Sequence, residues 1–193
     1  MASLSGSIER IVFRNTDSGF CVVRLRATQN GKTRARLTAS ITGIMPEVHP
    51  GLMLHLEGTW ETHPVHGRTF KVETFEEEMP TDVDEVERYL GSGIVRGIGP
   101  VTASRIVSIF GARSIAVLDQ EPEQLVQVPG LTAKRVQAIR QAWEEQNELR
   151  GLAIFLQSNG ISVTFARRIL EKYGETAQRQ IEEDPYLLAH DIQ

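Results

Sequence analysis

The residues in this sequence that could do chemistry are glycines in tight turns, each followed by an apolar residue. The clearest example is Gly97-Ile98-Gly99. Glycine suits such a turn because it adopts a left-handed backbone without steric penalty. A helix is expected to begin just after it, where the first N–H groups lack an intrahelical acceptor and carry the positive end of the helix dipole. This arrangement can bind a nucleic-acid phosphate without reading bases.

The turn belongs to a frame that occurs three times. Six places after the first glycine stands a small or β-branched residue, and nine places after it an isoleucine. The apolar residue beside each glycine (Ile98, Leu131, Ile161) is expected to lie between two helices, and the residue at plus six to let them approach closely. We interpret the three copies as helix-hairpin-helix units. The copies are Gly97, Ala103 and Ile106; Gly130, Val136 and Ile139; and Gly160, Ala166 and Ile169.

The alternative interpretation is that these glycines are ordinary helix C-caps in a structural bundle. It has most weight for the third hairpin, where Ser162 replaces the second glycine and no lysine follows closely. Thr132 replaces that glycine in the second hairpin. The residues predicted to contact DNA in the hairpins are Gly97, Ile98, Gly99, Thr102, Arg105, Gly130, Leu131, Thr132, Lys134, Arg135 and Gly160.

Two kinds of element would position these residues. Residues 1–79 alternate apolar and polar side chains in five runs separated by turns, which predicts a small five-stranded barrel of the oligonucleotide/oligosaccharide-binding (OB) type. Residues 80–193 have helical periodicity and would form the tandem helix-hairpin-helix domain. An acidic stretch from 76 to 82 marks the boundary. The fold class is thus a β-barrel followed by an all-α domain.

The barrel offers a second candidate DNA surface. If the turn after the second strand has three residues, Arg24 lies opposite Arg36 and Arg26 opposite Arg34. A two-residue Asn30-Gly31 turn would place two of these arginines toward the core, which is costly. We therefore predict four arginines on one face of the second and third strands, the face that OB barrels use for single strands. The alternative is an ordinary solvated outer face.

The totals exclude several classes of protein. A formal net charge of −4 in 193 residues argues against a generally basic DNA binder but not against a local basic patch. One cysteine excludes a disulfide framework and a thiolate zinc site, which fits a reducing cytoplasm. No metal site, catalytic residues, phosphate-binding loop, membrane span or secretion signal is expected from the pattern. The chain itself is therefore expected not to hydrolyse ATP.

Several segments resemble a known family. They are Tyr89 to Pro100 around the first hairpin, Gly58 to Pro64 with Gly67 to Phe70, Phe155 to Ile161, and Asp184 to Leu188. In these stretches, and in the order of barrel then hairpins, the chain resembles the N-terminal region of the stand-alone RecD-like DNA helicases of bacteria. The resemblance covers nearly the whole sequence.

The resemblance implies a non-catalytic DNA-binding region before a superfamily 1 motor that unwinds DNA 5′→3′ in repair and recombination. ATP and Mg²⁺ would serve that motor, whose Walker motifs are not in this sequence, so we expect a fragment that ends before it. It also implies a bacterial, cytoplasmic, nucleoid-associated protein. Its partners would be single-stranded or junction DNA bound without sequence preference, and possible single-strand-binding or repair proteins, with no membrane.

Two other functions remain open. RuvA-type junction-binding proteins also place an OB barrel before tandem hairpins, but with two clear copies and a distinct tail domain. Alternatively, the barrel docks a repair protein, which would show a different salt dependence from DNA binding. The repeat also predicts that a fourth hairpin begins at about Gln193, so residues after about Asp184 are expected to be poorly anchored.

Overall fold

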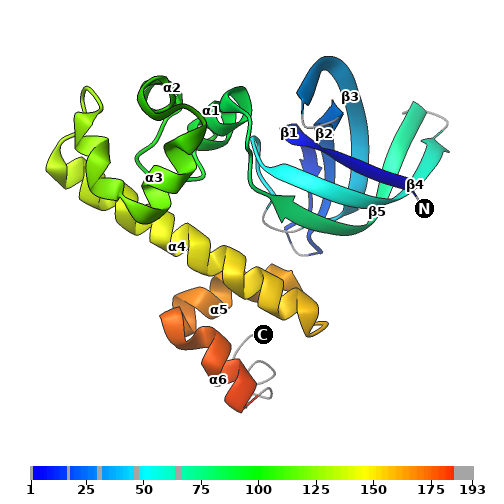
Figure 1. Ribbon diagram of the computed structural model, residues 1–193. Coiled ribbons are helices and arrows are strands. Elements are labelled where there is room, and N and C mark those ends of the chain that lie inside the picture. Colours follow the sequence, from blue (N-terminus) through cyan, green and yellow to red (C-terminus); the bar gives the residue numbers. More distant parts are fainter. Residues whose placement is uncertain (1, 17, 30–31, 46–47, 64–66, 185–193) are drawn as a thin grey trace. The chain divides into compact units, whose positions relative to one another are not determined.

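The computed structural model describes residues 2–16, 18–29, 32–45, 48–63 and 67–184. The chain packs as two compact units, residues 1–140 and 141–193, each described here by itself. The first unit begins with five strands and continues into helices, as expected (Figure 1). The strands are β1 (Ala2–Arg14), β2 (Phe20–Gln29), β3 (Lys32–Ile44), β4 (Met53–His63) and β5 (Gly67–Glu78).

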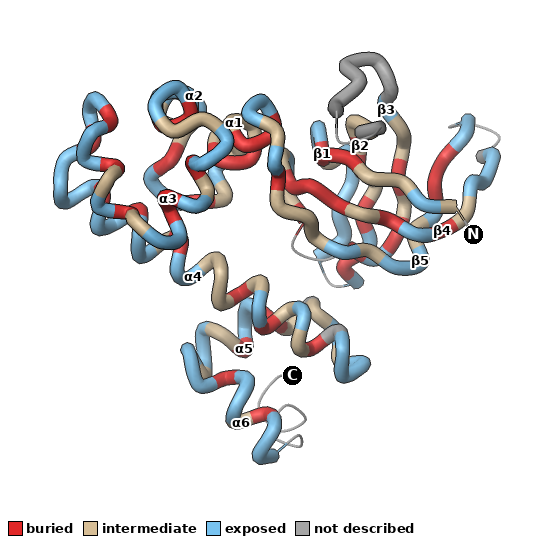
Figure 2. Tube along the Cα trace, in the orientation of Figure 1, coloured by how far each residue is buried: buried red, intermediate tan, exposed pale blue. Residues whose placement is uncertain are grey.

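The strands close into a barrel in the order β1-β2-β3-β5-β4, as predicted. β1 closes it by pairing with β4 along its first half and with β2 along its second. Gly6 lies where β1 changes partner, and a Cβ there would come within 2.3 Å of the Arg26 carbonyl oxygen, so this corner requires glycine. Buried residues alternate with more exposed ones along Phe20–Arg26 of β2, and Figure 2 shows buried segments on the barrel strands. The barrel core includes Ile8, Cys21, Val23, Leu25, Ile41, Leu54, Leu56 and Phe70.

The register of the β2–β3 hairpin differs from the predicted pairing of arginines across the two strands. Arg24 pairs with Ser40 and Arg26 with Thr38, instead of with Arg36 and Arg34. Gln29 pairs with Lys32, so the turn spans two residues, and a bulge between the pairs Arg26–Thr38 and Thr28–Thr33 restores the alternation. The prediction compared two turn lengths on a regular ladder and did not consider a ladder with a register shift. The predicted four-arginine face is therefore wrong in its pairing, and the side chains of Arg34 and Arg36 lie outside the described residues.

Helices follow the barrel from residue 83 onward. The first helix begins with an Asp82 side chain that accepts from the Asp84 N–H. The helices are α1 (Val83–Gly91), α2 (Pro100–Phe110), α3 (Ser114–Gln120), α4 (Ala133–Ser158), α5 (Ala166–Tyr173) and α6 (Ala177–Glu183). Short 3-10 turns stand between them: η1 (Gly111–Arg113), η2 (Pro122–Gln127), η3 (Val163–Phe165) and η4 (Gly174–Thr176).

A loop of the barrel packs directly on α1 within the first unit. Gly51 donates its N–H to the Ile8 carbonyl at 2.7 Å and has φ of 87°. A Cβ on Gly51 would lie 2.8 Å from the Ser92 Cβ and 2.9 Å from the Arg88 carbonyl oxygen. A cavity of about 640 Å³ adjoins this contact, lined by both barrel and helical residues. The barrel and the first two hairpins thus fold as one packed unit.

The stretch Pro100–Gln120 is long and apolar enough, by length and composition, to cross a membrane. The structure does not form one helix there, because Gly111 ends α2 with φ of 57° and a 3-10 turn separates it from α3. Its apolar residues Ala103, Ile106, Val117 and Leu118 are at most 3% exposed. These are the properties of core helices in a globular unit.

The second unit has its own core. It is built by the second half of α4 with α5 and α6, and Ala153, Phe155 and Tyr173 are among the partly buried residues packed against it. Its buried members are Leu149, Leu152, Leu156, Ala166, Ile169, Ala177 and Ile181. The predicted fourth hairpin and loosely held tail fall on residues 185–193, which lie outside the described residues.

Candidate nucleic-acid interface

Hairpin one is a β-turn followed at once by a helix. The Ile98 N–H donates to the Val95 carbonyl at 3.0 Å, and Gly97 occupies the third position with φ of 97°. Gly99 is the extended N-cap of α2 and makes no side-chain cap, and Pro100 is the first helical residue. The first N–H in this helix with an intrahelical bond is that of Ala103. The backbone of Val101 and Thr102 therefore offers donors at the positive end of α2.

Hairpin two closes in the same way. The Leu131 N–H donates to the Val128 carbonyl at 3.0 Å, and Gly130 has φ of 87°. Thr132 stands where the frame has its second glycine, and its Oγ1 accepts from the Arg135 N–H at 3.4 Å as a helix cap. Thr132, which departs from the glycine of the sequence frame, thus caps the start of α4. The N–H groups of Ala133 and Lys134 precede the first intrahelical bond, which Val136 makes to Thr132.

The side chains of the frame are buried as it predicts. Ile98 and Leu131 are 2% and 6% exposed, so their side chains contribute packing and are not available to a ligand. Thr102 is half-buried and Gly130 is exposed. The residues at plus six and plus nine are all at most 6% exposed: Ala103, Ile106, Val136, Ile139, Ala166 and Ile169.

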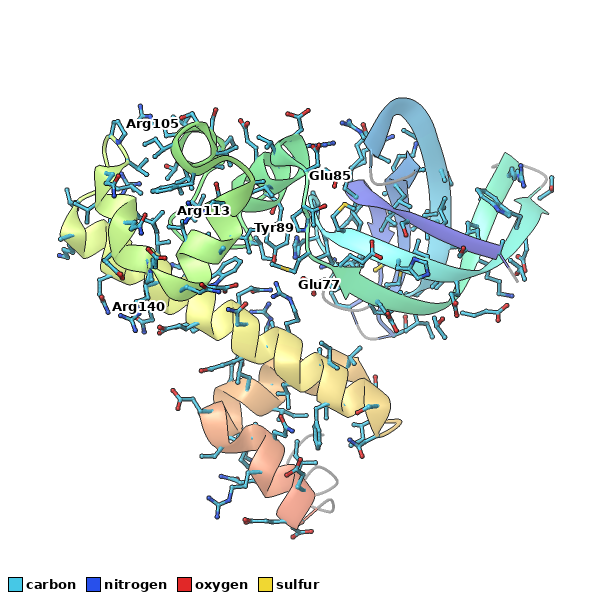
Figure 3. All side chains as sticks on the ribbon, viewed as in Figure 1. Glu77, Glu85, Tyr89, Arg105, Arg113 and Arg140 are labelled. Atoms are coloured by element: carbon cyan, nitrogen blue, oxygen red, sulfur yellow. The ribbon has the colours of Figure 1, made fainter. Side chains whose placement is uncertain are left out.

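Two predicted DNA-binding arginines hydrogen-bond to hairpin two itself. The Arg105 Nη1 reaches from α2 and donates to the Pro129 carbonyl at 3.1 Å (Figure 3). The Arg135 Nη1 donates to the Gly130 carbonyl at 3.0 Å. Lys134, by contrast, is exposed, and among the described residues its ammonium has no ion-pair partner. Lys134 is therefore the side chain best placed to meet a phosphate, and the two arginines hold the turn in shape.

Hairpin three differs in how the turn closes. The Ile161 N–H donates to the Leu156 carbonyl at 2.8 Å, and Gly160 has φ of 70°. This bond ends α4 in a Schellman-type cap. A 3-10 turn, η3, separates the glycine from α5, whose N-cap Phe165 makes no side-chain cap. Gly160 is exposed, but the start of the next helix does not follow it directly as in the other two hairpins.

Arg24 and Arg26, the described arginines of the barrel face, both form side-chain contacts with neighbouring residues. The Arg24 Nη1 donates to the Ser40 Oγ at 3.1 Å, and the Arg26 Nη2 forms an ion pair with Glu9 at 3.0 Å. Arg10 lies opposite Arg24 in the ladder and is exposed. Among the described residues Arg10 has no ion-pair partner.

Sequence reasoning assigned Phe20 to the arginine face of the barrel but missed two other exposed aromatic residues, Phe13 and Trp60. Phe13 is 52% exposed and its ring lies against Phe20, with centroids 6.4 Å apart. Trp60 is 37% exposed, and the Arg68 guanidinium lies 4.2 Å from the centroid of its ring. Phe13 stands in a strand whose register shifts between Ile11 and Phe13, so simple alternation does not reveal its outward face.

Comparison with known proteins matches both halves of the chain. Residues 1–80 match the model of the OB-fold domain of the ATP-dependent DNA helicase YrrC. Residues 90–145 match a SAM-like helix-hairpin-helix tandem, and residues 145–193 match the helix-hairpin-helix domain of the ATP-dependent RecD2 DNA helicase.

One curated relative aligns with almost the whole chain. The ATP-dependent RecD2 DNA helicase of Deinococcus radiodurans is 31% identical over 188 residues, which is 96% of this chain and 26% of the relative. The chain therefore spans about a quarter of the length of this relative. In its OB-fold and helix-hairpin-helix domains the chain is similar to the RecD2-type DNA helicases.

Proposed function

We propose that this chain is the non-catalytic DNA-binding region of an ATP-dependent 5′→3′ DNA helicase that acts in repair and recombination in the bacterial cytoplasm. The similarity to the domains of RecD2-type helicases supports a DNA-binding region of a helicase. The observation that carries the proposal is the pair of open helix N-termini at Gly97–Gly99 and Gly130–Thr132, with exposed Lys134 beside the second.

The hairpins would bind the sugar-phosphate backbone. Helix N-termini bind anions through N–H groups and the helix dipole, and neither feature distinguishes one base from another. Hairpins one and two both belong to the first unit, and Arg105 of the first hairpin bonds to the turn of the second. The two turns are thus fixed relative to each other, which lets them contact phosphates of one DNA molecule together.

ATP and Mg²⁺ would act in a motor outside this sequence, since the sequence has no phosphate-binding loop. The region described here would hold DNA while the motor moves along it. Two measurements check the finer parts of the proposal, the first on the full-length protein and the second on this chain alone. Unwinding should need a 5′ single-stranded tail and not a 3′ tail, and the isolated chain should show no DNA-stimulated ATP hydrolysis.

Charge reversal at Lys134 tests DNA binding directly. Lys134→Glu should weaken binding to duplexes of unrelated sequence about equally, and should lower the slope of log affinity against log salt by about 1. Fluorescence anisotropy with labelled duplexes over a salt series measures both quantities. Arg135 is left intact because its side chain holds the Gly130 carbonyl.

Arg14→Glu is the matched control, because Arg14 is exposed in the same unit but lies at the end of β1 and not at a helix N-terminus. It makes the same change in net charge and should leave the affinity close to that of the wild type. Equal losses for the two variants, or a loss at Lys134 that depends on sequence, would argue against phosphate binding at hairpin two.

A further inference from the structure

A cavity of about 640 Å³ in the first unit is lined by the barrel strands β1 and β2, by the loop at Pro50–Gly51 and by α1. Its helical wall is a single face of α1, because the residues that form it stand three, four and seven places after the first: Asp84, Glu87, Arg88 and Gly91. We call this space the β1–α1 cavity. Its volume lies within the range of ligand-binding pockets in proteins.

The hydroxyl of Ser7 opens into the β1–α1 cavity without a hydrogen-bond partner. Ser7 is only 4% exposed, yet its side chain makes no hydrogen bond to any described residue. Every fully enclosed side-chain N or O atom in the described part of the chain does have a partner, so the Ser7 Oγ must face open space. That space is the cavity, which Ser7 lines. Because a buried hydroxyl is costly unless it is hydrogen-bonded, this position favours a ligand that supplies a polar group.

The charged side chains around the cavity favour a cation. The Glu9 carboxylate lies 3.0 Å from the Arg26 Nη2, so this pair is neutral. The Arg88 Nε donates to the Asp84 carbonyl at 3.0 Å, which holds its guanidinium against its own helix. The carboxylates of Asp84 and Glu87 have no ion-pair partner among the residues that the structure describes. With three carboxylates against two guanidiniums, the lining is net negative, and a DNA phosphate would be repelled from it.

The apolar part of the lining identifies the kind of cation. Pro50 and Pro100 line the cavity and are exposed, so apolar surface leads inward from solvent to the polar groups. An arginine side chain has the matching form, an apolar stem with a charged head. Its five N–H donors can reach carboxylates and a hydroxyl together. A metal ion fits less well, because no three His, Cys, Asp or Glu side chains of the described residues are close enough to hold one.

We propose that the β1–α1 cavity binds an arginine side chain presented by a segment of another protein. The exposed rim residues Glu9, Asp84 and Pro100 leave the cavity open to such a segment. This site is separate from the proposed DNA contact and does not rest on it. The helix N-termini of the hairpins attract anions, whereas the cavity attracts a cation, so the first unit can hold DNA and a basic protein segment at the same time.

NMR titration of the isotope-labelled chain with the peptide acetyl-Ala-Gly-Arg-Gly-Ala-amide tests the proposal. Shift changes should centre on the amides of Ser7, Gly51 and Gly91, which line the cavity. The amides of the hairpin glycines, Gly97 and Gly130, should not respond. The same peptide with citrulline in place of arginine keeps the planar head but has no charge, and it should bind more weakly by about tenfold.

Two variants assign the binding to the cavity. Ser7→Ala should weaken peptide binding by roughly two- to tenfold, because the arginine loses one hydrogen-bond acceptor. Asp84→Asn with Glu87→Gln should weaken it by about two- to fivefold for each carboxylate. Glu73→Gln with Glu123→Gln is the matched control, since both carboxylates are exposed in the same unit, do not line the cavity and give the same change in charge. The control should bind the peptide as the wild type does.

Several outcomes would overturn the proposal: no binding of the arginine peptide, equal binding of the citrulline peptide, or equal losses in the control and the cavity variants. Displacement of the peptide by a DNA duplex would mean that nucleic acid occupies the cavity. If the full-length protein does not bind the peptide although this chain does, the occupant is a segment of the same protein and not of another. Lys134→Glu should weaken duplex binding and leave peptide binding unchanged, so failure of this proposal can be distinguished from failure of the proposed function.

Discussion

Hairpins one and two can be compared with hairpin three, because all three bury the same positions of one sequence frame. Ala103, Val136 and Ala166 are buried at plus six, and three isoleucines are buried at plus nine. The turns nevertheless differ. In the first two a β-turn places a left-handed glycine two residues before the N-cap, whereas Gly160 ends α4 and a 3-10 turn follows. The frame therefore encodes the packing of two helices, and not the geometry of the turn between them.

This difference separates a binding role from a structural one. In hairpins one and two the first N–H groups of α2 and α4 follow directly after the turn. In hairpin three the Phe165 N–H, at the start of α5, donates to the Ser162 carbonyl at 3.4 Å. A phosphate site needs several N–H groups that converge on one point. We therefore expect hairpin three to hold its own unit together and to add little to DNA affinity.

The largest expected effect comes from glycine replacement. Gly97→Ala forces an L-residue into φ of 97° and brings its Cβ within 3.2 Å of the Ile139 Cγ1. Gly160→Ala has φ of 70° and nothing within 4 Å of its Cβ. A left-handed alanine costs about 1–2 kcal/mol, which both variants should lose, and Gly97→Ala should lose more because Ile139 must also move. Urea unfolding with hydrogen exchange, which assigns the loss to one unit, measures the difference.

Gly99→Ala serves as the control for this comparison. Gly99 has φ of −100° and no atom near its Cβ, so alanine meets no strain there and loses only the modest N-cap preference. The comparison fails if Gly97→Ala and Gly160→Ala destabilise their units equally. It also fails if Gly99→Ala is as damaging as Gly97→Ala.

The sequence predicted most of the helical part because short-range rules decide it. α4 begins at Ala133, directly after the second predicted hairpin, and ends at Ser158, just before the third. Thr132 at its start and Gly160 after its end supply the local signals that fix these ends. The five strands were also predictable, since apolar alternation and turn residues act within a few positions.

What could not be predicted depends on contacts between distant residues. The β2–β3 register depends on a bulge between Arg26 and Thr28, and no local sequence pattern predicts the position of this bulge. The bonds from Arg105 and Arg135 to the carbonyls of hairpin two depend on which way long side chains turn. Phe13 and Phe20 meet only because the register of β1 shifts before Phe13. In each case the strand register or side-chain direction is determined by tertiary contacts, because the local sequence allows alternatives of similar energy.

A moderate effect is expected from the arginines that occupy equivalent places in hairpins one and three. Arg105→Ala removes the hydrogen bond to the Pro129 carbonyl and should cost the first unit about 0.5–1.5 kcal/mol. It should also weaken duplex binding, because the turn of hairpin two loses its support. Arg168 is exposed and has no ion-pair partner among the described residues, so Arg168→Ala should change stability little. Urea unfolding and anisotropy with a duplex measure both variants.

Arg105→Lys sharpens the comparison, since it keeps the charge but loses the planar donor that reaches Pro129. A positioning role predicts that the lysine variant resembles the alanine variant in stability. If Arg105→Lys restores full DNA affinity while stability stays low, Arg105 contacts phosphate directly and its bond to the turn is incidental.

The smallest expected effect belongs to the second unit and depends on pH. Burial raises the pKa of Glu148 above its usual 4.5, and the nearby charges of Glu175, Glu144 and Glu145 raise this pKa further. The folded unit therefore holds this proton more tightly than the unfolded chain. Between the unfolded and folded pKa values, stability falls as pH rises. At neutral pH the ionised Glu148 destabilises the second unit.

Glu148→Gln should consequently stabilise the second unit at neutral pH. The gain should fade as pH falls below the folded pKa, because the wild-type carboxyl is then neutral as well. Thermal unfolding of the two proteins from pH 7 to pH 4 tests this, with Glu171→Gln as a control that removes a charge on α5 outside this group. A constant difference between Glu148→Gln and the wild type across this pH range would mean that the substitution acts through packing and not through the proton.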